Sequence, residues 1–163
     1  MIKPGGKAII NYDDPNKDVF LLPYNNNITY GFNGGDYKTI DYQVSLLGTT
    51  FTFICDGVKQ NIKVPLIGKY NIYNVLSTII VLYEIGFTYS EIYDVLINIS
   101  SPAGRMEMIE YKNNRIIIDY AHTPDAVENV ISSVKEVCDG NIYTVFGCTG
   151  DRDRTKRPIM MKI

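Results

Sequence analysis

The spacing of the apolar residues changes at Gly68, and this change restricts the possible folds more than any other feature of the chain. Upstream of Gly68, short runs rich in β-branched and aromatic residues are separated by turn signals such as Asp56-Gly57, a pattern typical of hairpin-connected strands. We therefore predict an antiparallel or mixed sheet, with strands at residues 7–11, 27–32, 42–47, 50–55 and 58–66.

Downstream of Gly68 the spacing becomes helical. Residues 71–85 carry apolar side chains at i, i+3, i+4, i+7 and i+8, which predicts an amphipathic helix. Thr88 and Glu91 then fit a capping box at the start of a second helix, which we expect to end near Ile99. The linker after it predicts a boundary between a domain of residues 1–100 and a domain of residues 101–163.

The second domain is predicted to contain a hairpin and a β-α-β unit. Extended runs at 106–111 and 115–119 are joined by a short turn. Residues 123–125 supply an N-cap threonine, a proline at the first helical position and an aspartate near the positive end of the helix dipole. This helix should end near Cys138, and a strand at 142–146 would complete the unit.

Polar side chains follow both strands of the predicted β-α-β unit. Asp119 and His122 follow the first strand, and the charged segment 151–157 follows the second. Ligands of open α/β sheets bind beyond the carboxyl ends of parallel strands. A carboxylate there can accept hydrogen bonds from ribose hydroxyls, and arginines such as Arg152 and Arg157 can bind phosphate or carboxylate through two parallel hydrogen bonds.

Each of these features also has a purely structural interpretation, which the pattern alone leaves open. Asp119 can simply end a strand, and His122 can form a hydrogen bond before the helix cap. The segment 151–157 can be a solvated loop of mixed charge. For Asn71 and Asn74 the pattern alone favours the structural interpretation, a helix cap and an exposed helical residue.

Composition excludes several classes of protein. A net charge of −2 argues against general affinity for nucleic acid or an anionic membrane surface. The longest apolar stretch, residues 75–83, is too short to span a membrane. With no signal peptide visible and three cysteines that lack zinc-site spacing, we expect reduced thiols in a cytoplasmic protein. Residues 5–7 resemble the end of a phosphate-binding P-loop, but Ala8 stands where that motif needs Ser or Thr, so we reject this site.

Four segments resemble, in order and spacing, motifs of the Mur ligase family: residues 68–74, 104–107, 119–126 and 147–158. Residues 5–15 resemble the family's central domain as well, and Thr149 departs from the family, which usually has glycine there. The resemblance implies an α/β fold. Residues 1–100 would be the C-terminal part of the ATP-binding central domain, with short strands and then two helices, and residues 101–163 the start of a Rossmann-like C-terminal domain.

The resemblance also implies an activity and a set of binding residues. Within the family, the last two motifs resemble those of ATP-dependent ligases that add meso-diaminopimelate or L-lysine to UDP-MurNAc-L-Ala-D-Glu through an acyl phosphate. The residues implied in ATP binding are Asn71, Asn74, Arg105, Asp119 and His122. Asn74 would contact adenine with support from Asn71, Arg105 would reach the phosphates, Asp119 would hold the ribose, and His122 would lie against the nucleotide. Arg152 and Arg157 are both candidates for the carboxylate of the incoming amino acid.

The family's other catalytic parts have no counterpart in this sequence. Its phosphate loop and Mg²⁺ ligands are expected upstream, so we expect no catalytic or metal-binding residue here and no activity from this chain alone. Three hypotheses remain open. The chain can be a segment of a full ligase with ATP and Mg²⁺ as cofactors, an inactive remnant that binds nucleotide weakly, or an unrelated α/β binding module.

Overall fold

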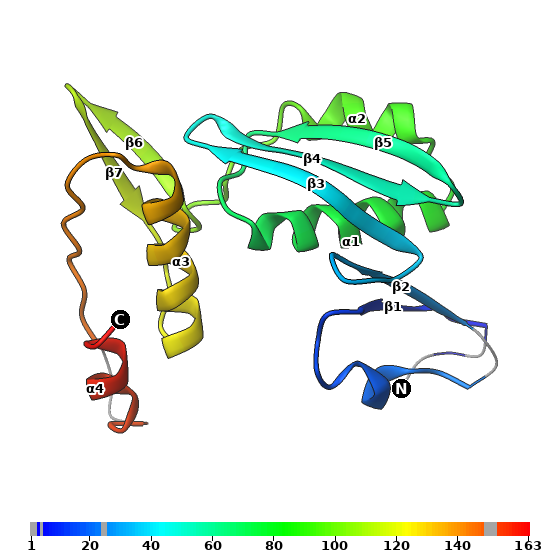
Figure 1. Ribbon diagram of the computed structural model, residues 1–163, viewed down its shortest axis with the longest axis horizontal. Helices are drawn as coiled ribbons and strands as arrows, with labels where there is room; N and C mark the ends of the chain where they lie inside the picture. The colour runs from blue at the N-terminus through cyan, green and yellow to red at the C-terminus, as the bar shows by residue number, and fades with distance from the viewer. Residues whose placement is uncertain (1–2, 4, 24–25, 149–152) are drawn as a thin grey trace.

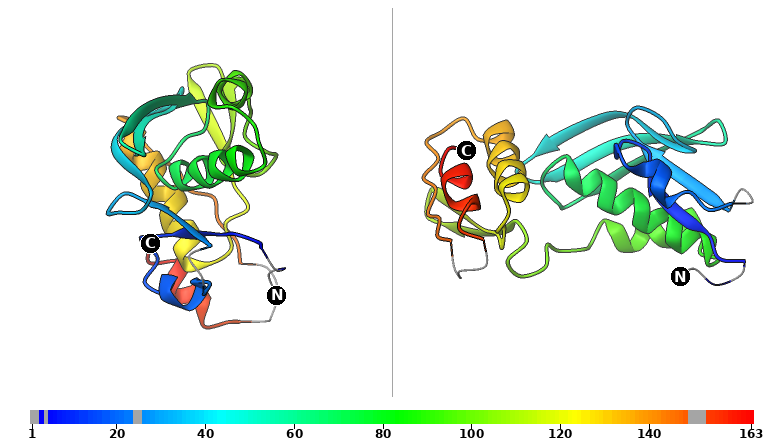
Figure 2. Two further views of the ribbon diagram at one scale, coloured as in Figure 1. Left: turned by 90° about the vertical axis from the view of Figure 1, so that its right-hand side faces the viewer. Right: turned by 90° about the horizontal axis from the view of Figure 1, so that it is seen from below.

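The computed structural model describes residues 3, 5–23, 26–148 and 153–163. Figures 1 and 2 show a larger group of elements, β1–β5 with α1 and α2, next to a smaller group that contains β6, β7, α3 and α4. Among the described residues, no helix is long and apolar enough to cross a membrane.

The larger group is built on a mixed five-stranded sheet whose strands lie side by side in chain order. The strands are β1 (Ala8–Asn11), β2 (Asn27–Gly31), β3 (Tyr37–Ser45), β4 (Gly48–Cys55) and β5 (Val58–Val64). β1 and β3 each pair with β2 in parallel, whereas β3–β4 and β4–β5 are antiparallel. The predicted mixed sheet is confirmed, although β3 begins earlier than Tyr42, where it was expected.

Helices α1 (Tyr70–Glu84) and α2 (Tyr89–Leu96) cover one face of this sheet (Figure 2). Because side chains alternate along a strand, Phe51 and Phe53 point into the core under the helices, and Thr50 and Thr52 are less deeply buried. The core also contains the apolar stripe of α1, namely Ile72, Val75, Leu76, Ile79 and Ile80. This stripe is the helical pattern expected from the sequence.

The two helices begin and end where local signals place them. The Thr88 hydroxyl accepts a hydrogen bond from the Glu91 N–H at 3.3 Å, and the Glu91 carboxylate accepts one from the Thr88 N–H at 2.8 Å. The predicted capping box is therefore complete. Gly86 takes a φ of +105° just after α1, where helices commonly end in the left-handed region. α2 ends at Leu96, slightly before the predicted Ile99.

The smaller group begins with the predicted hairpin of β6 (Glu107–Tyr111) and β7 (Asn114–Ile118). Helix α3 (Pro124–Val137) follows, and the Thr123 hydroxyl caps it by accepting the Ala126 N–H at 3.3 Å. The short elements η1 (Lys17–Phe20) and α4 (Lys156–Met160) were not predicted. α4 packs against α3.

The predicted strand at 142–146 was wrong, and no β-α-β unit forms in the described part of the chain. The segment does alternate: Ile142, Thr144 and Phe146 line an apolar groove against α3, while Tyr143 and Val145 are 86% and 100% exposed. A strand also needs a hydrogen-bonded neighbour, however, and among the described residues none pairs with this segment.

The β6–β7 hairpin leaves an apolar face uncovered, and we expect the isolated chain to self-associate. Ile109 and Ile116 are direct cross-strand partners on this face, with exposed fractions of 43% and 49%. Uncovered apolar faces and open strand edges favour association. Sedimentation velocity should show an average mass that rises above 18.5 kDa with concentration. The double variant Ile109→Thr, Ile116→Thr should weaken the rise. A monomer at every concentration would contradict this expectation.

Candidate functional site

The candidate site begins where the first turn of α1 meets α3. Gly68, just before α1, is buried and has a φ of +103°. A Cβ at this position would lie 2.9 Å from the Ser133 Oγ of α3 and 2.9 Å from the ring of Tyr70. Ser133 is itself buried and donates its hydroxyl hydrogen to the Asn129 carbonyl at 2.7 Å. The larger and smaller groups of elements therefore touch at a position that has room only for glycine.

Replacing Gly68 by alanine should destabilise this contact by about 1–3 kcal/mol, because the added Cβ meets both a disfavoured φ and the Ser133 side chain. Gly86→Ala is a matched control, because Gly86 has a φ of +105° and a Cβ there would meet nothing within 4 Å. Urea unfolding should show a larger loss for Gly68→Ala. Equal losses in the two variants would mean that Ser133 does not restrict this position.

Asn71 and Asn74 lie on the first turns of α1 and are linked to each other. The Asn71 side-chain amide donates to the Ile67 carbonyl at 2.8 Å, and the Asn74 amide donates to the Asn71 Oδ1 at 3.1 Å. Asn71 is half-buried and Asn74 is exposed. The pair therefore forms a short chain of amides that runs from the backbone to the surface.

Asp119 and Arg105 come together through the loop before β6. The Asp119 carboxylate accepts a hydrogen bond from the Met106 N–H at 2.9 Å, and the Gly104 carbonyl accepts one from the Tyr120 N–H at 2.8 Å. The Arg105 guanidinium carbon lies 5.6 Å from the centre of the Tyr120 ring, within the range of a cation–π contact. Asp119 thus holds the loop that carries Arg105.

His122 lies on the same loop cluster. Its Nδ1 is 3.0 Å from the Tyr120 carbonyl oxygen, and its ring centre is 5.4 Å from that of Tyr120. Both rings are exposed. The imidazole is therefore oriented by the backbone of Tyr120 and presented at the surface.

Tyr70 links these two clusters electrostatically. Burial raises the pKa of Tyr70 to about 12, the Asp119 carboxylate adds to the rise, and Arg105 opposes it. The charges of Asp119 and Arg105 are thus felt at Tyr70, in the first turn of α1. Sequence reasoning missed Tyr70 and Tyr120 as neighbours of the site, because neither has a chemical pattern of its own.

The described part of this charged segment, residues 153–157, lies elsewhere. Arg157 is half-buried on α4, which lies beside α3 and away from the start of α1 (Figures 1 and 2). Arg152 and Thr149 lie outside the described residues. Among the described residues, no group of three or more His, Cys, Asp and Glu side chains is arranged so that it could hold a metal ion.

Comparison with known proteins identifies the family. Residues 1–82 match the family model described as the Mur ligase middle domain, and residues 104–163 match the one described as the Mur ligase, glutamate ligase domain. The chain belongs to the Mur ligase family.

Two curated relatives carry the same name, UDP-N-acetylmuramoyl-L-alanyl-D-glutamate--2,6-diaminopimelate ligase. The protein of Clostridium acetobutylicum, numbered 1, is 37% identical over 168 residues, which cover 100% of this chain and 35% of that protein. The protein of Halalkalibacterium halodurans is 37% identical over 162 residues, which cover 98% of this chain and 33% of that protein. The chain therefore spans about a third of these relatives.

Solved structures agree with the assignment of the fold. A structure of a UDP-N-acetylmuramoyl-L-alanyl-D-glutamate--2,6-diaminopimelate ligase superposes with a TM-score of 0.70 at 33% identity, over 96% of this chain and 34% of that one. MurF from Acinetobacter baumannii superposes with a TM-score of 0.74 at 17% identity, over 83% of this chain and 30% of that one, and is evidence for the fold alone.

Proposed function

We propose that this chain is part of an ATP-dependent ligase that joins meso-diaminopimelate to UDP-MurNAc-L-Ala-D-Glu. The observation that carries the proposal is 37% identity over the whole chain to a relative named as this ligase. The names of the relatives favour diaminopimelate over L-lysine, a choice that the motifs leave open. The two substrates are therefore the nucleotide-linked dipeptide and this diamino acid. A cytoplasmic location remains a prediction.

The surface between the start of α1 and the loop before β6 is proposed to bind ATP. Asn74 would contact adenine, and its 3.1 Å hydrogen bond to Asn71 supports it in that role. Asp119 would accept hydrogen bonds from the ribose, and Arg105, which it helps to hold, would reach the phosphates. His122 would lie against the nucleotide, because its ring is exposed on the same loops.

Arg152 and Arg157 are both proposed for the carboxylate of the incoming amino acid. A guanidinium group can bind a carboxylate through two parallel hydrogen bonds, which fixes its orientation as well as its charge. The choice between the two arginines rests on separate Arg→Lys variants, since lysine keeps the charge and loses the paired geometry. The arginine that matters should show the larger rise in KM for diaminopimelate.

The proposed reaction depends mainly on positioning. The terminal phosphate of ATP passes to the substrate carboxylate, which gives an acyl phosphate and ADP. The amine of diaminopimelate then attacks the acyl carbon, and inorganic phosphate leaves as the amide forms. This chain's residues would bind and orient ATP and the amino acid, which lowers the barrier by proximity and charge stabilisation. Mg²⁺ would neutralise phosphate charge, with ligands expected upstream of this chain.

The test uses the native polypeptide that carries this sequence, captured with an antibody raised against the chain. It is incubated with ATP, Mg²⁺, UDP-MurNAc-L-Ala-D-Glu and either meso-diaminopimelate or L-lysine, and the UDP-linked tripeptide is measured by mass spectrometry. We expect an ATP-dependent product with diaminopimelate. Product with L-lysine alone would correct the substrate. No product with either amino acid, from a polypeptide no longer than this chain, would favour the inactive remnant.

A further inference from the structure

We propose that Asp13 is a positioning residue for the ATP surface, because its carboxylate ties the loop after β2 to the first turns of α1, which carry Asn71 and Asn74. This inference rests on the proposed function of that surface.

The Asp13 carboxylate joins two elements that are far apart in the sequence. Its Oδ2 accepts hydrogen bonds from the Phe32 N–H at 2.7 Å and from the Tyr73 hydroxyl at 2.8 Å. Its Oδ1 accepts the Asn33 N–H at 3.0 Å. Two donors thus come from the loop after β2 and one from α1, so this side chain sets the distance between them.

The loop is shaped to close on this carboxylate. A Cβ on Gly31 would lie 2.8 Å from the Asp13 Oδ2, and a Cβ on Gly34 would lie 2.5 Å from the Tyr12 ring. Contacts this short are not found for real Cβ atoms, so glycine at both positions lets the loop reach residues 12 and 13. Asp13 is in turn held by its own N–H, which donates to the Asn11 Oδ1 at 2.9 Å.

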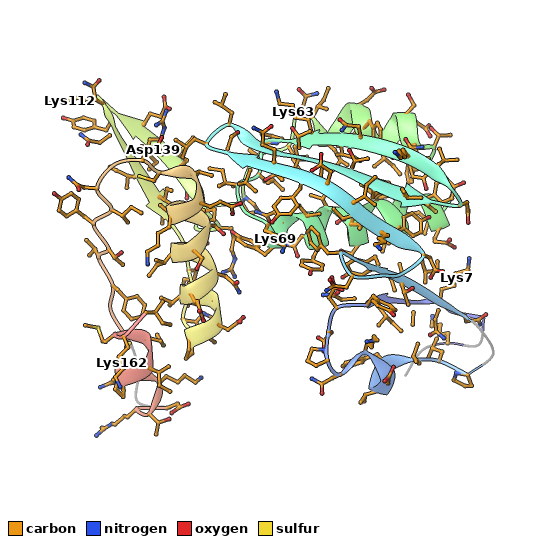
Figure 3. All side chains as sticks on the ribbon, viewed as in Figure 1. Lys7, Lys63, Lys69, Lys112, Asp139 and Lys162 are labelled. Atoms are coloured by element: carbon orange, nitrogen blue, oxygen red, sulfur yellow. The ribbon has the colours of Figure 1, made fainter. Side chains whose placement is uncertain are left out.

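Aromatic contacts connect the loop after β2 to the start of α1, where the proposed site lies. The Phe32 ring packs edge-on against Tyr73 at 5.0 Å between ring centres, and the Lys69 ammonium lies 4.6 Å from the Phe32 ring centre. Lys69 is the residue just before α1, and Tyr73 lies in the first turns of the helix, so the two flank Asn71, and Tyr73 directly precedes Asn74. Figure 3 shows Lys69 at the end of α1 that faces the smaller group of elements. A shift of this turn would therefore move both asparagines.

The carboxylate is ionised under ordinary conditions, which strengthens its hydrogen bonds. Burial alone would raise the pKa of Asp13, but hydrogen bonds from Phe32, Tyr73 and Asn33 hold this pKa below its usual value. Hydrogen bonds to a charged acceptor are stronger than those between neutral groups. Asp13→Asn keeps the size of the side chain and removes this charge.

The first readout is hydrogen exchange by mass spectrometry on the 163-residue chain without nucleotide. Asp13→Asn should speed exchange in residues 31–35 and 70–76 and leave α2 as in the wild type. A purely global loss of stability would instead speed exchange everywhere. Asp14→Asn is the control, because the Asp14 carboxylate lies next in sequence and accepts the nearby Asn16 N–H at 2.7 Å, with no side-chain bond to α1 or to the loop after β2 among the described residues. It should change neither segment.

The second readout is steady-state kinetics of the captured native polypeptide. Asp13→Asn should raise KM for ATP about tenfold, as expected when a hydrogen bond to a charged group is weakened, with kcat changed less than KM. Asp14→Asn should match the wild type. If Asp13→Asn does not fold, Tyr73→Phe, which removes only the phenolic hydroxyl, is judged by the same two readouts.

Local exchange and KM both at wild-type values would overturn the proposal, and so would faster local exchange with an unchanged KM. A wild-type polypeptide that turns over without ATP would instead refute the proposed function. In that case the exchange data alone would decide whether Asp13 ties the loop to α1.

Discussion

Replacement of Asp119 by alanine in the native polypeptide should raise KM for ATP by about 10- to 100-fold, because it removes one or two hydrogen bonds to a charged acceptor. The carboxylate is proposed to accept hydrogen bonds from the ribose. It also accepts the Met106 N–H at 2.9 Å, which holds the loop that carries Arg105. The variant would therefore lose the proposed contact with the ribose and also the hydrogen bond that orients Arg105. Steady-state kinetics with ATP as the varied substrate provide the measurement.

Asp139→Ala is the matched control for this prediction. Asp139 is an exposed carboxylate two residues beyond the C-terminal end of α3, and it has no proposed contact with the nucleotide. Figure 3 labels it at this end of the helix. Its loss should leave KM unchanged. Asp119→Asn should have an intermediate effect, since the amide oxygen can still accept the Met106 N–H. An unchanged KM in Asp119→Ala would remove this residue from the proposed ribose role.

Phe53→Ala should lower the free energy of unfolding of the larger group by about 3–5 kcal/mol, the usual cost of removing a buried phenylalanine. Phe53 is completely buried at the centre of the sheet. Its ring lies 5.9 Å from that of Tyr37 and 6.4 Å from that of Tyr89, between ring centres, so alanine would leave a cavity under α2. Urea unfolding at low protein concentration, followed by circular dichroism, measures this loss.

Leu47→Ala is the control for the core prediction. Leu47 is 78% exposed in the turn between β3 and β4, so its loss should change stability by no more than about 0.5 kcal/mol. If Phe53→Ala also costs under about 1 kcal/mol, the sheet and helices do not form one cooperative core in solution.

Elements with strong local signals could be predicted from the sequence. The apolar stripe of α1, the Thr88–Glu91 capping box and the Thr123 cap depend only on residues within one or two turns. The β4–β5 hairpin likewise follows from Asp56-Gly57, where Asp56 takes a φ of +49° and Gly57 one of +76°. These elements were predicted to within a few residues.

Elements that depend on distant partners could not be predicted in the same way. β2 and β3 pair in parallel although only a short segment of chain connects them. A connection of this length usually leads to antiparallel pairing. The segment 142–146 has the alternation of a strand but no neighbour among the described residues. α4 overlaps the charged segment 151–157, for which a binding role and a solvated loop both remained open, and its short sequence has no helical periodicity of its own.

In the candidate site, too, individual residues could be identified from the sequence, but the contacts between distant residues could not. The end of the predicted strand at 115–119 pointed to Asp119, and the resemblance supplied Asn71 and Arg105. The roles of all three remain proposals. The resemblance did not indicate that Asp119 and Arg105 influence Tyr70, or that Asp13 holds the loop after β2. These contacts join residues that are far apart in the sequence, and no local pattern encodes them.

The most direct test of the account is to photolabel the native polypeptide with 8-azido-ATP and identify the labelled peptide. Trypsin cuts after Lys69 and Arg105, so the start of α1 lies in the peptide of residues 70–105. If Asn74 contacts adenine, the label should fall within this peptide, and excess ATP should prevent it. A label competed by ATP in β4, in β5 or outside this sequence would contradict a nucleotide surface at the start of α1.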